Sequence, residues 1–255
     1  HAYRFFSHLP DWFASDQEDW KKRFDHMGEA LNAIQMESEV DITKDLLNVL
    51  SKASESGESL DISKTFTLMG FDMISKAVFG YDLGGVKGTE EGEKIFKALE
   101  SLAEKQSGEG LYANPNARKI SAEEEAEAKT TWRNFLKKCL SVLMTEVDSH
   151  GKGKHVAFGK ALKAFAQVAV SSMEGPREEN MEKLMLCEVH QILRHGHEAI
   201  GGMLTWLLIA LHQWPQVRQE LERALRSSSN AKKPEYLECV VKETLRRYPV
   251  CGNMT

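Results

Sequence analysis

The residues best suited to chemistry stand together in one short run, Arg194-His195-Gly196-His197-Glu198, inside a stretch that is otherwise apolar. Guanidinium, imidazole and carboxylate groups can donate or accept hydrogen bonds, and the last two can also exchange protons. A buried polar group without a partner costs about 1 to 3 kcal/mol. These side chains must therefore bond to one another and to other helices, or else act on a ligand, and both interpretations stay open.

A metal centre is not expected from this run. The five residues from His197 to Gly201 begin like the HExxH motif of zinc proteases, in which two histidines four residues apart bind the ion on one helical face. Gly201 stands where the second histidine is required. No DDxxD-type carboxylate cluster occurs either, and no CxxC spacing joins the cysteines, which are Cys139, Cys187, Cys239 and Cys251.

Composition limits the class of protein further. A chain of 255 residues with 42% hydrophobic residues and no Pro/Ser-rich linker is expected to form one domain over residues 1–255. The 33 Lys plus Arg against 38 Asp plus Glu, with no basic stripe, argue against a nucleic-acid partner. No apolar run of about 18 residues occurs, so we expect a cytoplasmic protein, while an anchor upstream of His1 stays open.

Helix signals dominate the chain and no alternating strand pattern of useful length occurs, so the predicted fold class is all-α. Capping boxes open helices at Ser15 and Ser121, because serine and the glutamate three residues later satisfy free backbone donors. Residues 108–120 are expected to form a loop. The expected helices cover 15–36, 41–57, 61–80, a segment from 89, 121–148, 157–171, 178–213, a segment from 215, and 234–249.

Three segments resemble a known family. YLECVVKETLRRYP ends the chain's last helix and contains Glu243 and Arg246 at the spacing of an ExxR motif. Upstream lie HGHEAIGGMLTWLLIALHQWPQVRQELERAL, similar to a long central helix with its successor, and FDMISKAVFGYDLG. In their order along the chain, these three segments resemble the helical middle of a cytochrome P-450, from its third helix to its ExxR helix. The resemblance implies a helical cytochrome P-450-like core in which Glu243 and Arg246 are structural.

The resemblance also implies a haem cofactor, yet three haem contacts of the family are missing. The family's iron is held by a cysteine thiolate in a glycine-rich loop well after the ExxR helix. No such loop occurs before Thr255, and Cys251 is interpreted as an ordinary apolar residue. The family's WxxxR motif is also incomplete, because the residue four after Trp20 is Phe24.

The third loss lies in the central helix, where the family has a small residue, glycine, any residue, an acid and threonine. Here His195 replaces the small residue and Ala199 replaces the threonine that guides protons to dioxygen. The sequence therefore predicts a truncated, haem-free relative without a cofactor. A fragment of a haem-thiolate monooxygenase is the alternative, and haem would then be its cofactor.

The favoured hypothesis is an enzyme of secondary metabolism that uses the emptied apolar pocket. It would bind an apolar, terpenoid-like substrate and promote a redox-neutral cyclisation or Diels-Alder-type cycloaddition, with His195, Arg194 or Glu198 as hydrogen-bonding groups. A noncatalytic binding or scaffold protein that associates with other pathway enzymes is the third hypothesis. The expected pocket residues, at near-helical spacing, are Ile192, Ala199, Gly202, Met203 and Trp206.

Overall fold

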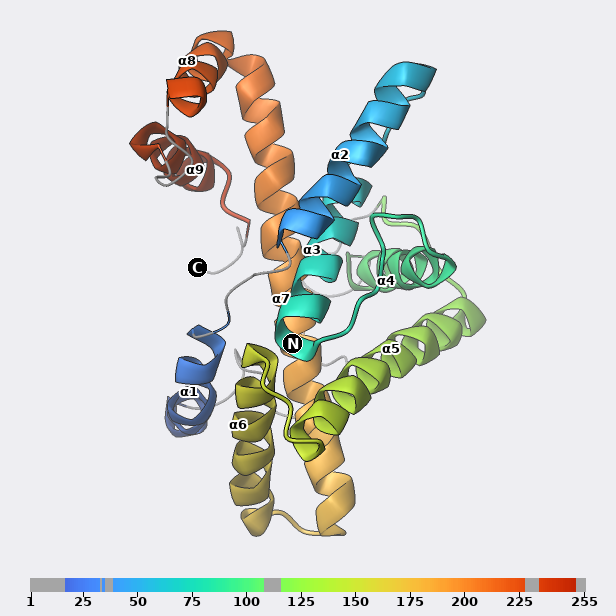
Figure 1. Ribbon diagram of the computed structural model, residues 1–255. Helices are drawn as coiled ribbons and strands as arrows, with labels where there is room; N and C mark the ends of the chain where they lie inside the picture. Colours follow the sequence, from blue (N-terminus) through green and yellow to red (C-terminus); the bar gives the residue numbers. More distant parts are fainter. Residues whose placement is uncertain (1–16, 33, 35–38, 108–115, 228–233, 251–255) are drawn as a thin grey trace.

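The computed structural model describes residues 17–32, 34, 39–107, 116–227 and 234–250 (Figure 1). This part of the chain is helical, with no strand, and none of its helices is long and apolar enough to cross a membrane. The all-α prediction is therefore confirmed. The elements are α1 Gln17–Asn32, α2 Glu39–Ser56, α3 Ile62–Phe79, α4 Glu90–Ser107, α5 Ala122–Asp148, α6 Lys154–Ala169, η1 Val170–Ser172, α7 Arg177–Gln213, α8 Pro215–Ser227 and α9 Glu235–Arg247.

Local capping explains why these helices begin and end where the sequence predicts. The Asp61 carboxylate accepts from the Lys64 backbone N–H at the start of α3, and Gly80 ends that helix at φ +71°. The Ser121 hydroxyl accepts from the Glu124 backbone N–H at the start of α5. The capping box at Ser15 and residues 108–115 of the predicted loop lie outside the described residues.

Several boundaries differ from expectation. Helix α1 ends at Asn32, four residues before the predicted end, and Ile34 is not helical. Helix α9 ends at Arg247, two residues before the predicted end. Helix α2 begins at Glu39, two residues before the predicted start, and α6 begins at Lys154, three residues before it. At the start of α6, Gly153 takes the extended conformation of an N-cap and makes no side-chain hydrogen bond. The 37-residue helix α7 agrees with the predicted range within one residue.

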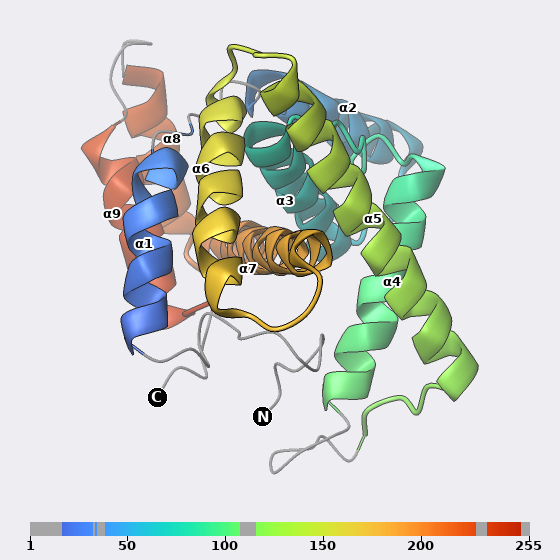
Figure 2. The same ribbon diagram turned by 90° about the horizontal axis from the view of Figure 1, so that it is seen from below.

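Helix α7 runs through the molecule, and the other helices are arranged along it (Figures 1 and 2). Helix α3 packs most closely against it because glycines stand at their crossing. A Cβ atom on Gly70 would lie 2.9 Å from the backbone oxygen of His197, and one on Gly201 would lie 3.0 Å from the Thr67 Cα. The two backbones therefore touch almost directly, which fixes which side of α7 faces the core.

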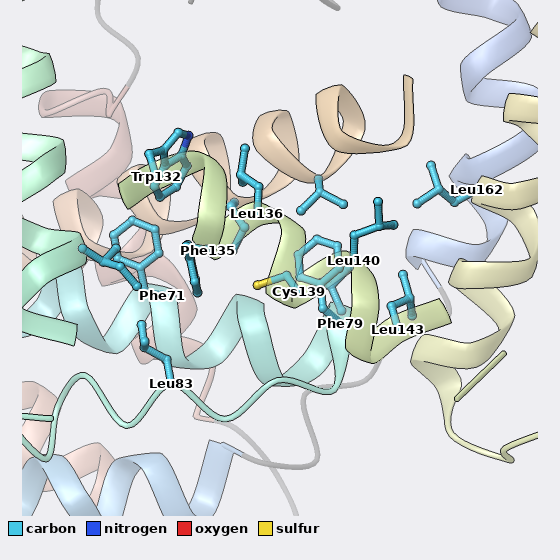
Figure 3. Packing of buried hydrophobic residues seen from close by; sticks show 14 of the residues in the cluster. Phe71, Phe79, Leu83, Trp132, Phe135, Leu136, Cys139, Leu140, Leu143 and Leu162 are labelled. Atoms are coloured by element: carbon cyan, nitrogen blue, oxygen red, sulfur yellow. The ribbon is translucent and has the colours of Figure 1, made fainter. Parts of the chain in front are cut away.

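The main core lies where α3, α4, α5, α6 and α7 meet, and Met27 of α1 also belongs to it. One face of α5 supplies much of it, and its side chains point toward Phe71, Phe79 and Leu83 (Figure 3). A smaller cluster joins α2, α3 and the segment after α3. The fully buried residues of α5 with 2% exposure or less are Trp132, Phe135, Leu136, Cys139 and Leu143.

Candidate functional site

The polar run of α7 is divided between two opposite sides of the helix. His197 faces α3, is 5% exposed, and stacks on Phe71 with ring centroids 3.9 Å apart. Its Nδ1 donates to the Leu193 carbonyl oxygen over 2.7 Å. Burial lowers the pKa of His197 to about 4, so its imidazole is neutral near pH 7. His197 is therefore part of the core.

The other side of α7 carries the predicted site, which we call the outer face. It comprises His195, Ala199, Gly202 and Trp206, which recur every three or four residues and therefore share one side of the helix. Ala199 is exposed, Trp206 is 40% exposed and His195 is half-buried. Half-buried Met203 borders this face, whereas half-buried Ile192 packs against the main core. Helical periodicity thus brings most of the predicted pocket residues together, on an open surface of the described chain.

The segment after α9 closes one end of the outer face. The Trp206 indole stacks on the Tyr248 ring with centroids 4.5 Å apart and planes 1° apart. A Cβ atom on Gly202 would lie 3.0 Å from Val250 Cγ1, so glycine allows this close approach. The sequence reasoning missed Tyr248 and Val250. A glycine in the middle of an apolar helix was the available signal that another segment approaches there.

His195 is held by a residue that the sequence reasoning also missed. Its Nε2 lies 3.0 Å from Oε1 of Gln191, one helical turn earlier, and Gln191 is only 6% exposed. An amide oxygen can only accept, so Nε2–H of His195 donates to it. The four-residue spacing of the two side chains was the signal that could have found this pair.

Arg194 and Glu198 border the outer face as a pair. Arg194 Nε lies 3.5 Å from Glu198 Oε1, and the glutamate side chain is 45% exposed. The interpretation that these side chains bond to other protein groups therefore holds for Glu198, which pairs with Arg194, and for His197, which bonds to the Leu193 carbonyl oxygen. Within the described ranges, no group of three or more His, Cys, Asp and Glu side chains is arranged to hold a metal ion.

Glu243 and Arg246 bond to each other on the surface of α9. Arg246 Nε and a terminal guanidinium nitrogen each donate to one carboxylate oxygen over 2.7 Å, and this keeps the pKa of Glu243 below its ordinary value. Their side chains are 52% and 69% exposed. In the described part of the chain the pair connects no second element, so the structural role implied by the resemblance is not visible as a contact between helices.

Two residues of the outer face differ from those that the resemblance to the family implies beside a haem. The family needs a small residue against the porphyrin plane, whereas the imidazole of His195 projects from this position and is fixed by Gln191. Ala199 has no hydroxyl group to bond to an iron-bound ligand. The side chains of Trp20 and Phe24, at the incomplete WxxxR motif, lie outside the described residues.

The chain is similar to proteins of one known family. The family profile described as Cytochrome P450 matches residues 11–255. Cytochrome P450 4V2 of Pongo abelii is 22% identical over 251 residues, covering 90% of this chain and 48% of the relative. Secologanin synthase 1 of Catharanthus roseus is 24% identical over 229 residues, covering 83% of this chain and 42% of the relative.

A solved structure agrees with the fold. The crystal structure of a cytochrome P450 (CYP102L1) superimposes with a TM-score of 0.67 at 16% identity, covering 96% of this chain and 57% of that one. The chain thus spans about half the length of the curated relatives it matches. Since the profile match extends over nearly all of its residues, the chain belongs to the cytochrome P450 family.

Proposed function

We propose that the outer face of α7 binds an apolar metabolite and that His195 acts on it in a redox-neutral cyclisation or cycloaddition. One observation carries this proposal: His195, fixed by a buried glutamine, stands beside the small, exposed Ala199 on an otherwise apolar face. Small-molecule sites combine an apolar surface with a few directed polar groups in this way. A terpenoid-like molecule suits such a surface.

The chemistry proposed asks little of the protein beyond orientation and one polar group. Holding two reacting parts of a molecule in register can supply about 7 to 11 kcal/mol of the barrier in favourable cases. One well-placed acid or base contributes typically about 10²- to 10⁴-fold. The flat Trp206–Tyr248 stack at one end of the face offers an aromatic wall against which a folded substrate could lie. Arg194 and Glu198 supply charge at the border.

Substitution of Ala199 tests whether ligand binds at this place. Ala199→Trp should fill the space beside His195 and abolish both binding of an apolar fluorescent probe, anilinonaphthalene sulfonate, and product formation from metabolite extracts followed by mass spectrometry. Leu208→Trp is the matched control, because Leu208 is 47% exposed on another side of α7. If both tryptophan variants fold and behave like the parent, the proposed site is wrong and a noncatalytic scaffold becomes the better interpretation.

A second candidate function follows from the coverage of the relatives. Because the chain spans about half of their length, it could constitute the helical part of a haem-thiolate monooxygenase. Hemin titration separates the candidates. Our proposal expects no stoichiometric uptake, whereas a Soret band with the carbon monoxide shift of a thiolate ligand would favour the monooxygenase.

A further inference from the structure

We infer that the groove between the end of α7, α8 and α9 is a second binding site, that its ligand is a flat aromatic carboxylate, and that Arg247 receives the carboxylate group. We call this place the α8–α9 groove. It is separate from the outer face of α7, and its ligand takes no part in the reaction proposed above. The two proposals can therefore fail independently.

The α8–α9 groove has the size and the walls of a small-molecule site. Helices α8 and α9 lie beside the end of α7 (Figure 1), and the space between them measures about 320 Å³. Small-molecule sites range from roughly 300 to 1,000 Å³ and are mostly apolar. One wall is a face of α9 from Tyr236 to Arg247, and the other includes Leu211, Trp214 and Val217. The volume therefore suits a ligand of one or two rings.

Arg247 provides a positive charge at one end of the groove. Its guanidinium carbon lies 4.6 Å from the centroid of the Trp214 ring, and the indole face holds the planar cation in position. Among the described residues, no hydrogen bond or ion pair occupies the N–H groups of Arg247. A guanidinium group can donate two parallel hydrogen bonds to one carboxylate. Arg247 is thus oriented by Trp214 and has donors left for an anion.

The remaining charges at the groove cancel each other. Both carboxylate oxygens of Glu243 accept hydrogen bonds from Arg246 over 2.7 Å. These bonds and, to a smaller extent, the charge of Arg247 keep the pKa of Glu243 below its ordinary value, so Glu243 is ionised near pH 7. Glu243 and Arg246 together contribute no net charge. Arg247 leaves one positive charge, which favours a ligand with one negative charge.

Aromatic side chains favour a flat ligand. Trp214, Tyr236 and Tyr248 all line the groove. Tyr248 also separates the groove from the outer face, because its ring stacks on Trp206. Contacts between aromatic rings gain free energy beyond the area that they bury. We therefore expect an aromatic acid to bind more tightly than an aliphatic acid of the same volume.

The thiol of Cys239 can report on occupancy of the groove. Cys239 lines the groove and is exposed, whereas Cys139 and Cys187 are buried. The probe is 2-naphthoate, and its neutral amide of the same shape, 2-naphthamide, is the control. Mass spectrometry of the Cys239 peptide measures how fast N-ethylmaleimide labels the full chain. We expect 2-naphthoate to slow this labelling at concentrations at which 2-naphthamide has no effect. Equal effects of the two compounds overturn the inference.

Substitution of Arg247 tests the contact with the carboxylate group. Arg247→Gln should weaken binding of 2-naphthoate about tenfold or more in calorimetric titration. Arg226→Gln is the matched control, because it removes the same charge from an exposed position of α8 that does not line the groove. Val217→Trp should fill the groove and abolish binding. Parent-like affinity of a folded Arg247→Gln contradicts the inference, and protection of Cys239 in the parent tests it even if Val217→Trp does not fold.

Other occupants of the groove give different results. If Ala199→Trp abolishes binding of 2-naphthoate while Val217→Trp does not, the anion binds at the outer face and the inference is wrong. It is also wrong if Cys239 of the ligand-free chain is labelled only on dilution, since a second copy then fills the groove. The dye anilinonaphthalene sulfonate cannot replace 2-naphthoate here, because the anilino group beside its sulfonate shields this anion from a guanidinium group.

Discussion

The indole of Trp206 and the ring of Tyr248 lie almost parallel, 4.5 Å apart, although one belongs to the C-terminal part of α7 and the other follows the last turn of α9. Aromatic pairs of this kind contribute about 0.5 to 1.5 kcal/mol beyond the area they bury. The stack therefore stabilises the packing of the end of α9 against the outer face of α7. It also forms one border of the candidate site.

Removing this stack should loosen the C-terminal helices. Tyr248→Ala is expected to lower the free energy of unfolding by about 1 kcal/mol, which corresponds to a fall in melting temperature of roughly 2 to 4 °C in a chain of this size. Tyr248→Phe keeps the ring and should melt close to the parent. Leu225→Ala serves as a control at a 48% exposed position of α8. If Tyr248→Ala melts like Tyr248→Phe, the stack contributes nothing to stability.

The crossing of α3 and α7 should not tolerate a side chain at Gly70. A methyl group there would lie 2.9 Å from the backbone oxygen of His197, and a backbone atom cannot move aside without shifting its helix. Overpacking of this kind costs typically about 1 to 3 kcal/mol. Gly70→Ala should therefore reduce the denaturant midpoint markedly.

Gly196→Ala provides the comparison for this variant, because its methyl group would meet the side chain of Ile74, at 2.8 Å, instead of a backbone. The isoleucine can rotate, and alanine favours a helix over glycine by roughly 1 kcal/mol. We expect Gly196→Ala to be much less destabilised than Gly70→Ala. Equal midpoints for the two variants would show that α3 and α7 adjust freely.

Two buried histidines should make the chain sensitive to acid. Trp132 Nε1–H donates to Nδ1 of His190 over 2.8 Å, and burial lowers the pKa of His190 to about 3 from an ordinary value of 6.5. His197 behaves similarly, with a pKa of about 4. Below about pH 6.5 these two histidines take up protons in the unfolded chain, whereas in the folded chain they stay neutral. Their contribution to stability is therefore complete above this pH and is lost as the pH falls.

Denaturant unfolding at pH 7 and pH 5 measures this effect. The slope should be on the order of 1 kcal/mol per pH unit for each histidine. His190→Gln keeps an acceptor for Trp132 and should reduce the loss between the two pH values. His212→Gln, at an exposed position near the end of α7, is the control and should follow the parent. The assignment to His190 is wrong if both glutamine variants show the parent's slope.

The ExxR pair should matter little for the stability of this chain. Glu243 and Arg246 are exposed and bonded only to each other among the described residues, and exposed pairs of this kind contribute little. Arg246→Ala should melt near the temperature of the parent. Added salt should change the melting temperature of the parent only a little. A clear fall in melting temperature, with Lys242→Ala as a control on the same helix, would show that Arg246 holds a second element.

The sequence by itself determined the helical class, most helix boundaries and the composition of the outer face. These features are local: caps act within four residues, and a 3.6-residue period decides which side chains of α7 share a side. His195, Ala199 and Trp206 are thus grouped by their spacing alone. The division of His195 from His197 onto opposite sides of α7 follows from the same period, although which side faces the core does not.

Tertiary packing decided the rest. The approach of Gly70 to His197 turned one side of α7 toward α3 and so left His195 on the open side. The stacking of Tyr248 on Trp206 joins residues more than 40 positions apart, and no local rule predicts such a contact. Burial of Gln191 made its amide oxygen a fixed partner of His195, whereas exposure left Glu243 and Arg246 paired only with each other within the described part of the chain. Contacts between distant segments depend on how whole faces fit together, and this is the information that a periodic pattern lacks.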